Sequence, residues 1–298
     1  MDLALHSASP RSGGDGATPA PPMAGAGEAA NVVALHCSGA GAAQWRSLAE
    51  ALGASRRLIA PEHFGCDSEG PWTGAHAFAL ADEAARTIAL IDQADRPIHL
   101  VGYSYGGGVA LYVALARPQR IASLALYEPS AFHVLRQIGP AGTKAFDEIT
   151  DLARATGEDV AVGDFRSAAE RFVDYWNGAG AWRAIRPAAQ NAITRWMPKA
   201  PLDFNALIRE RTPIGAYAAL PMPTLLLRGE HAPTPTRIIA ETLAMLMPDA
   251  ALAVIAGAGH MGPLTHAAEV SARIVAHIDL AHARRGRMRT IPPPRRAV

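Results

Sequence analysis

The sequence predicts an α/β fold, a mostly parallel sheet flanked by helices, and three observations lead to this prediction. Short apolar runs alternate with segments of helical periodicity, the pattern of parallel strands joined by crossover helices. These runs are apolar at nearly every position, as expected for strands that are buried on both faces. The alternation stops at Glu128-Pro129 and resumes at Thr224. The six expected strands are Asn31–His36, Arg57–Pro61, Ile98–Tyr103, Ile121–Tyr127, Thr224–Arg228 and Leu252–Ile255.

Helical segments follow most of these strands, and a long one interrupts the pattern. Residues 132–217 show helices and loops without a convincing strand, and they hold most of the aromatic residues of the chain. We therefore expect one α/β core with an inserted helical cap. The other expected helices cover about 43–52, 76–94, the stretch up to 116, 235–247 and 265–283. The expected organisation is a disordered or weakly ordered N-terminal segment (1–30), the core (31–131 and 218–282), the cap (132–217) and a basic tail (283–298).

Composition excludes several classes of protein. The chain has 298 residues and a net charge of +1, which gives no general attraction to nucleic acid or to an anionic membrane. The Arg-rich tail is interpreted as a solvated terminus rather than a binding arm. With two cysteines, no secretory signal and no apolar stretch of membrane-spanning length, we expect a cytoplasmic protein without nucleic-acid or membrane partners. The oligomeric state stays open.

The segment GYSYG, residues 102–106, carries the first sign of chemistry. It matches G-x-S-x-G and lies where an apolar strand ends and a helix begins, which is the setting of a nucleophile elbow. Such a turn lifts the hydroxyl of its serine above the edge of the sheet. Gly102 and Gly106 allow the strand and the helix to approach closely. Ser104 is therefore the candidate nucleophile.

A serine hydroxyl needs a base and an oxyanion site to react at neutral pH. His260 is the candidate base, because it follows the last expected strand in the flexible segment GAGHM, and loops at strand ends meet at one edge of the sheet. The backbone N–H groups of Ser38, in the loop after the first expected strand, and of Tyr105, directly after the nucleophile, are the candidate oxyanion donors.

These motifs together resemble those of the α/β-hydrolase fold superfamily, in its serine-nucleophile branch with a helical cap. The resemblance covers roughly residues 31–282. In chain order, the resembling segments are LHCSGAG for the oxyanion loop, RLIAPEHFGCDSEG for the loop after the next strand, HLVGYSYGGGVAL for the elbow, PTLLLRGE for the acid-bearing strand and IAGAGHMGP for the histidine-bearing strand. Five segments in the family's order imply its fold and a Ser-His-acid triad.

The sequence departs from the family pattern in two places. Cys37 stands where the oxyanion loop usually has glycine, and it could lie near Cys66, so that a regulatory thiol pair is a minor hypothesis. Ala232 stands where the family usually has its triad Asp. The acid that orients the histidine must then come from elsewhere at the same sheet edge. Glu128, which ends a strand, is favoured, and Glu230 is the alternative.

The expected function is that of a cofactor-free serine hydrolase that cleaves a small, mostly apolar ester or related acyl compound through an acyl-enzyme. Carbon–carbon bond hydrolysis or perhydrolysis on the same triad, and a non-catalytic ligand-binding protein, are the alternatives. Aromatic residues of the cap either line the pocket or form the core of the cap, while Tyr103, Tyr105 and His63 are possible pocket residues. No metal-ligand spacing or dinucleotide motif is present, so neither a metal nor a cofactor is expected.

Overall fold

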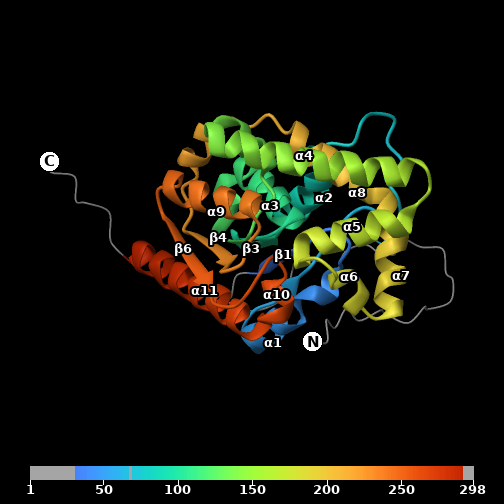
Figure 1. Ribbon diagram of the computed structural model, residues 1–298. Coiled ribbons are helices and arrows are strands. Elements are labelled where there is room, and N and C mark those ends of the chain that lie inside the picture. The colour runs from blue at the N-terminus through green and yellow to red at the C-terminus, as the bar shows by residue number, and fades with distance from the viewer. Residues whose placement is uncertain (1–30, 67–68, 291–298) are drawn as a thin grey trace, which may run out of the picture.

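Six parallel strands form one sheet, in the order β2-β1-β3-β4-β5-β6 (Figure 1). The computed structural model describes residues 31–66 and 69–290. The strands are β1 (Val32–Leu35), β2 (Leu58–Ile59), β3 (Ile98–Tyr103), β4 (Ile121–Tyr127), β5 (Thr224–Gly229) and β6 (Ala250–Ile255). The predicted fold class is confirmed, and the central strands β3 and β4 have the bounds that the sequence predicts.

The edge strands differ from the prediction. β2 is limited to two residues instead of the expected Arg57–Pro61, and Pro61 has no N–H to offer to a ladder. β6 begins at Ala250 rather than Leu252, because it pairs with β5 from Thr224 onward. Several side chains of β6 are exposed, so the strand is not the continuous apolar run that marks a buried strand.

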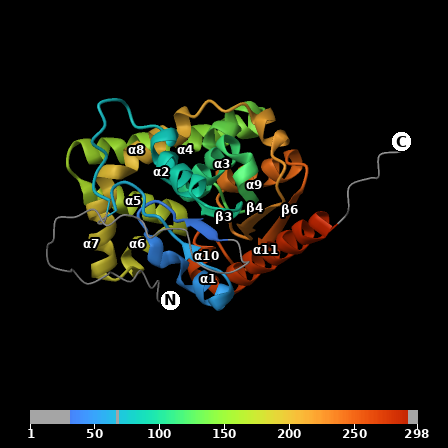
Figure 2. The ribbon, with the colours of Figure 1, turned by 180° about the vertical axis from the view of Figure 1, so that it is seen from behind.

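Helices cover both faces of the sheet, and the alternation of side chains along the strands explains how (Figures 1 and 2). Val33 and Leu35 of β1 belong to the cluster that packs under α2, α3 and α9, whereas Val32 and Ala34 pack toward α1 and α11. The covering helices are α1 (Arg46–Leu52), α2 (Leu80–Asp92), α3 (Tyr105–Ala116), α9 (Thr234–Leu246) and α11 (Ala267–Thr290). Short helices η1 (Ala42–Trp45), η2 (Gly53–Ser55), η3 (Pro118–Arg120) and α10 (Gly262–Thr265) lie in the connections.

The segment between β4 and β5, here called the helical insert, holds no strand in any of its residues, all of which are described. In Figure 1 its helices α5 to α8 gather beside the sheet, while α4 runs along α9 and α8. The insert consists of η4 (Phe132–Gln137), α4 (Pro140–Ala161), α5 (Phe165–Asn177), α6 (Ala181–Ala184), α7 (Pro187–Trp196), η5 (Met197–Lys199), α8 (Ala200–Arg209) and η6 (Ile214–Ala219).

The last helix is longer than the sequence analysis expects. α11 continues to Thr290, beyond the predicted end near Ala283, since no proline interrupts the chain before Pro292. Arg284, assigned to the tail, lies in this helix and pairs with Asp249 at 3.1 Å. The N-terminal segment 1–30 and the end of the basic tail lie outside the described residues. None of the described helices is long and apolar enough to span a membrane.

Candidate active site

Ser104 lies on a strained turn between β3 and α3. Its backbone has φ 54° and ψ −116°, a conformation that is costly for a residue with a side chain. Two flanking glycines make the turn feasible, because a Cβ on Gly106 would overlap the carbonyl of Leu35, and one on Gly102 would lie 2.6 Å from the carbonyl oxygen of Gly106. The Ser104 N–H donates to the carbonyl of Tyr127 at 3.0 Å, which fixes the turn against β4.

A chain of two hydrogen bonds joins the hydroxyl of Ser104 to a buried carboxylate. His260 Nε2 lies 2.9 Å from Ser104 Oγ, and His260 Nδ1 lies 2.7 Å from Glu128 Oε2. A carboxylate only accepts, so Nδ1 carries the proton and Nε2 is free to accept the proton of Ser104. All three side chains are buried, and residues from three different loops thus form one contiguous proton path.

Glu128 is held in place by its backbone and by two further donors. It directly follows β4 and has φ 41°, a second strained position at this edge of the sheet. Its Oε1 accepts the N–H of Gly229 at 2.9 Å, and its Oε2 accepts the hydroxyl of Thr236 at 2.8 Å. Three donors on one carboxylate fix its orientation.

The structure distinguishes the two acids that the sequence leaves open. Glu128 contacts the imidazole of His260, whereas the described contact of Glu230 is to the N–H of Gly257, at 2.8 Å, on an exposed side chain. Strand order alone does not decide between the two acids, because Glu230 follows β5, which is the direct neighbour of β6. The loop after β6 lies over the end of β4 instead, where the Tyr127 hydroxyl donates to the carbonyl of Gly259.

Two aromatic rings pack against the imidazole of His260. The indole of Trp176 in α5 stacks on it, with ring centroids 4.4 Å apart and planes 28° apart, and Tyr103 lies 5.3 Å away. The loop that carries the histidine is anchored by the Tyr127 hydroxyl, which donates to the carbonyl of Gly259 at 2.7 Å. The insert thus contributes a wall to the histidine site, a role of Trp176 that the sequence analysis does not single out.

The predicted oxyanion donors border the same space. Ser38 and Tyr105 both line the cleft beside Ser104, and Tyr105 begins α3, where the first N–H groups of a helix have no partner within the helix. Cys37 also lines the cleft, and its N–H and thiol both donate to Gln44 Oε1, at 3.2 and 3.1 Å. Burial raises the pKa of the Cys37 thiol to about 12, so this thiol is inert.

A cleft opens above Ser104, with an empty volume of about 890 Å³ that includes its solvent-open part. Its walls are mainly apolar and come largely from the insert. Both predicted roles of the insert aromatics occur: some line the cleft, while Trp182 and Phe165 pack within the insert. His63, a possible pocket residue from sequence, is not among the lining residues and lies buried beside His36 instead. The aromatic residues that line the cleft are Tyr103, Tyr105, Phe132, Phe172, Trp176, Trp196 and Phe204.

A second buried polar network, here called the Lys199 network, ties the insert to the core. The Lys199 ammonium lies 2.5 Å from Asp203 Oδ1 and 2.9 Å from Glu83 Oε2. Asp203 also accepts the hydroxyl of Ser38 at 2.7 Å, and Glu83 accepts that of Tyr105 at 2.8 Å. Both residues that carry the predicted oxyanion N–H groups are therefore held by this network.

Burial and the contacts within the Lys199 network shift the pKa values of its members. Burial disfavours the ammonium, but Asp203 and Glu83 outweigh it and raise the pKa of Lys199. Burial also opposes ionisation of Glu83, yet His63 and Lys199 hold its pKa well below the usual value. Burial raises the pKa of Asp203. Sequence gave no signal for this network, because its members lie up to 165 residues apart.

Comparison with known proteins supports the fold. A family model described as "Alpha/beta hydrolase family" matches residues 32–273. The chain belongs to this family. Solved structures agree: MGS-M2, an α/β hydrolase from a Medee basin deep-sea metagenome library, is 14% identical, with a TM-score of 0.70 over 85% of this chain and 90% of that one. A hydrolase from Pseudomonas aeruginosa PA01 is 22% identical, with a TM-score of 0.66 over 86% and 92%. At these identities the likeness shows the fold alone.

The curated relatives of this family member carry several different names. The 2-hydroxymuconate semialdehyde hydrolase of Pseudomonas sp. CF600 is 28% identical over 80% of this chain and 83% of its own length. The pimeloyl-[acyl-carrier protein] methyl ester esterase of Aeromonas salmonicida is 28% identical over 56% of this chain and 65% of its own length. Polyketide synthase ThaQ of Burkholderia thailandensis is 28% identical over 85% of this chain, but this chain spans only 12% of that protein.

Proposed function

We propose that this protein is a serine hydrolase that cleaves a small, mostly apolar ester or related acyl compound through an acyl-enzyme. The observation that carries the proposal is the unbroken hydrogen-bond chain from Ser104 through His260 to Glu128 at the floor of an apolar cleft. A proton path of this kind activates a hydroxyl that is otherwise a poor nucleophile. The match to esterase and hydrolase relatives supports the same reaction class.

The mechanism follows from the positions of the proton acceptors. Ser104 Oγ attacks the carbonyl carbon of the substrate while His260 Nε2 takes its proton. Glu128 holds the imidazole by Nδ1 and stabilises the imidazolium that forms. The N–H groups of Ser38 and Tyr105 bind the oxyanion, and His260 then protonates the leaving alcohol. Water, activated by His260, hydrolyses the acyl-enzyme and regenerates the hydroxyl of Ser104.

Carbon–carbon bond hydrolysis is the second candidate, because a relative that matches most of this chain is named for a semialdehyde substrate. The muconate part of that name denotes a carboxylate. The cleft of this chain has neither arginine nor lysine among its described lining residues, and the carboxylate of its lining residue Asp203 is held by Lys199 and Ser38. An anionic substrate would meet no cationic side chain in this lining, and we therefore favour a neutral ester.

The two candidates separate in a substrate comparison. We expect turnover of p-nitrophenyl esters with short to medium acyl chains, with a burst equal to one enzyme equivalent as the acyl-enzyme accumulates. Hydrolysis of a vinylogous diketone acid, measured in parallel, should be slower by at least about 100-fold. Turnover of the diketone acid without turnover of any ester would overturn the ester assignment.

A further inference from the structure

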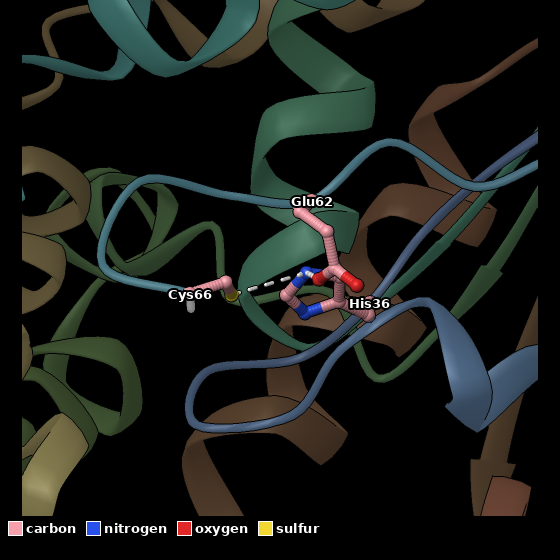
Figure 3. Close-up of side chains that lie close together, drawn as sticks. All are labelled: His36, Glu62 and Cys66. Carbon is pink, nitrogen blue, oxygen red and sulfur yellow. Dashed lines mark hydrogen bonds and ion pairs between the residues drawn. The ribbon is translucent and has the colours of Figure 1, made fainter. Parts of the chain in front are cut away.

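We propose that His36, Glu62 and Cys66 form a binding site for a divalent metal ion of the zinc class. The site joins the loop after β1 to the loop after β2 and lies outside the lining of the cleft (Figure 3). Each residue offers one ligand atom, and the three atoms all lie within 4.8 Å of one another. The site is separate from the proposed reaction, and the metal ion takes no part in it.

The tautomer of His36 leaves its Nε2 unprotonated on the side of this site. Its Nδ1 lies 2.8 Å from the carbonyl oxygen of Cys37, which can only accept, so Nδ1 carries the proton. The other nitrogen, Nε2, accepts the N–H of His63 at 3.2 Å, a long hydrogen bond that a metal ion would replace. A histidine that donates one N–H to a backbone carbonyl and has its other nitrogen unprotonated has the arrangement typical of metal-bound histidines.

The carboxylate of Glu62 faces His36 Nε2 in an arrangement that a cation would stabilise. Its Oε2 lies 3.0 Å from His36 Nε2 and is buried without a hydrogen-bond donor among the described residues. Two electron-rich atoms at this distance repel each other unless a proton or a metal ion lies between them. A metal ion satisfies both atoms without charging the ring.

Cys66 supplies the third ligand and determines the class of metal. Its Sγ lies 3.7 Å from His36 Nε2 and 3.5 Å from the carbonyl of Ala40. Tetrahedral zinc with ordinary bond lengths separates its nitrogen, oxygen and sulfur ligands by about 3.3–3.6 Å, so small side-chain adjustments suffice. Thiolate and imidazole together select zinc, or cobalt as its spectroscopic substitute, over magnesium or calcium. One carboxylate and one thiolate also neutralise the +2 charge.

The surroundings allow the ion to enter and give it a structural effect. The Glu62 side chain is 26% exposed, which leaves a route from solvent. Coordination would replace the long hydrogen bond from the N–H of His63 and would release the proton of the Cys66 thiol to solvent. Because Glu62 already holds the N–H of Ala42 at 3.0 Å, the ion would stiffen the loop that carries the proposed oxyanion donor Ser38.

Cobalt binding to the untagged, reduced full chain tests the proposal. We expect one equivalent of Co²⁺ with a thiolate-to-cobalt charge-transfer band, which persists in Cys37→Ser and is lost in Cys66→Ser. Cys37 is the matched control, since its thiol turns to Gln44. Cobalt binding without the band, as at surface histidines, would overturn the proposal, and so would a band that survives Cys66→Ser.

A second measurement does not depend on any variant folding. Zn²⁺ should slow the alkylation of Cys66 in the wild-type chain by at least about tenfold and raise its thermal unfolding midpoint. The modification is followed by peptide mass spectrometry after limited exposure to iodoacetamide. An unchanged rate of Cys66 alkylation at saturating Zn²⁺ would contradict the site.

Discussion

Two buried polar systems meet at the floor of the same cleft, and they are built differently. The Ser104–His260–Glu128 chain is linear, and its middle member is an imidazole, the side chain best suited to take up and return a proton near neutral pH. All its members come from the carboxyl ends of strands in the core. Its geometry fits proton transfer.

The Lys199 network has the opposite character. Its middle member is an ammonium fixed between two carboxylates, so the positive charge of Lys199 is already paired on both sides. It joins the insert, which supplies Lys199 and Asp203, to α2, which supplies Glu83. We infer that the first system performs chemistry, whereas the second holds the insert and the oxyanion loop in place. Variants of the first should lose activity, and variants of the second should lose stability.

The largest expected effect comes from removing the nucleophile. Ser104→Ala should lower kcat for an ester by at least about 10⁴-fold, because it removes the hydroxyl that lies on His260 Nε2 and forms the proposed acyl-enzyme. Steady-state kinetics measure kcat, and a urea unfolding curve measures stability. The unfolding midpoint should not fall. Ser130→Ala is the matched control, since its hydroxyl lies 3.3 Å from that of Ser104. Loss of activity in the control alone would assign the nucleophile to Ser130.

The acid should have the next largest effect. Glu128→Gln keeps the shape of the side chain but no longer fixes the productive tautomer of His260, and kcat should fall by about 10²–10⁴-fold. Glu230→Gln changes the other acid that the sequence left open and should leave kcat within about twofold. If Glu230→Gln gave the larger loss, the assignment of the acid would be wrong.

Breaking the Lys199 network tests the other half of the comparison. Lys199→Met leaves Glu83 and Asp203 buried without their cation and should lower the free energy of unfolding by about 3–5 kcal/mol, measured by urea denaturation. At a temperature where the variant is folded, kcat should change by less than about tenfold. Lys144→Met removes an exposed lysine and should have little effect on either quantity. A stable Lys199 variant with abolished activity would reverse the two roles.

The smallest effect concerns His99, a buried histidine without a carboxylate partner. Its Nδ1 lies 2.8 Å from Ser123 Oγ, and burial lowers its pKa to about 3. Below pH 6.5 the unfolded chain binds a proton at this position that the folded chain does not. The stability gained by keeping His99 neutral in the folded chain is therefore complete above pH 6.5 and is lost as the pH falls toward 3.

By pH 5 this loss amounts to about 2 kcal/mol from His99, at about 1.4 kcal/mol for each pH unit. Unfolding free energies at pH 7, 6 and 5 should therefore fall less steeply for His99→Gln than for the wild-type chain. The exposed His231, for which no side-chain ion pair is described, provides the control, and His231→Gln should leave the wild-type slope unchanged. Parallel slopes for all three proteins would contradict the assignment.

The fold was largely predictable from sequence because local patterns encode it. β3 and β4 are buried along their whole length and apolar at nearly every position, with His99 and Ser123 as the polar exceptions, and the prediction of their bounds is confirmed. The bounds of β6 were predicted only in part, because an edge strand with exposed side chains lacks the continuous apolar pattern of a buried strand. The position of Ser104 could be predicted for a related reason, because the G-x-S-x-G turn is a contiguous motif with one structural setting.

The long-range parts of the site could not be predicted in the same way. The sequence left Glu128 and Glu230 open, and the path of the loop after β6, which lies over the end of β4, brings Glu128 to His260. The Lys199 network joins elements with no local signature. The absence of a metal-ligand spacing led to the expectation of no metal site, yet His36 and Cys66 meet because β1 and β2 are neighbours in the sheet. In each case, packing decides which residues meet.

Labelling with a fluorophosphonate tests the central claim most directly. This reagent modifies a serine only when a base and an oxyanion site activate it, and peptide mass spectrometry shows which hydroxyl has reacted. We predict stoichiometric labelling of Ser104 in the wild-type chain, a rate reduced by at least about 100-fold in Glu128→Gln, and unchanged labelling in Glu230→Gln. A folded wild-type chain that stays unlabelled, or that carries the label on Ser130, would contradict the account.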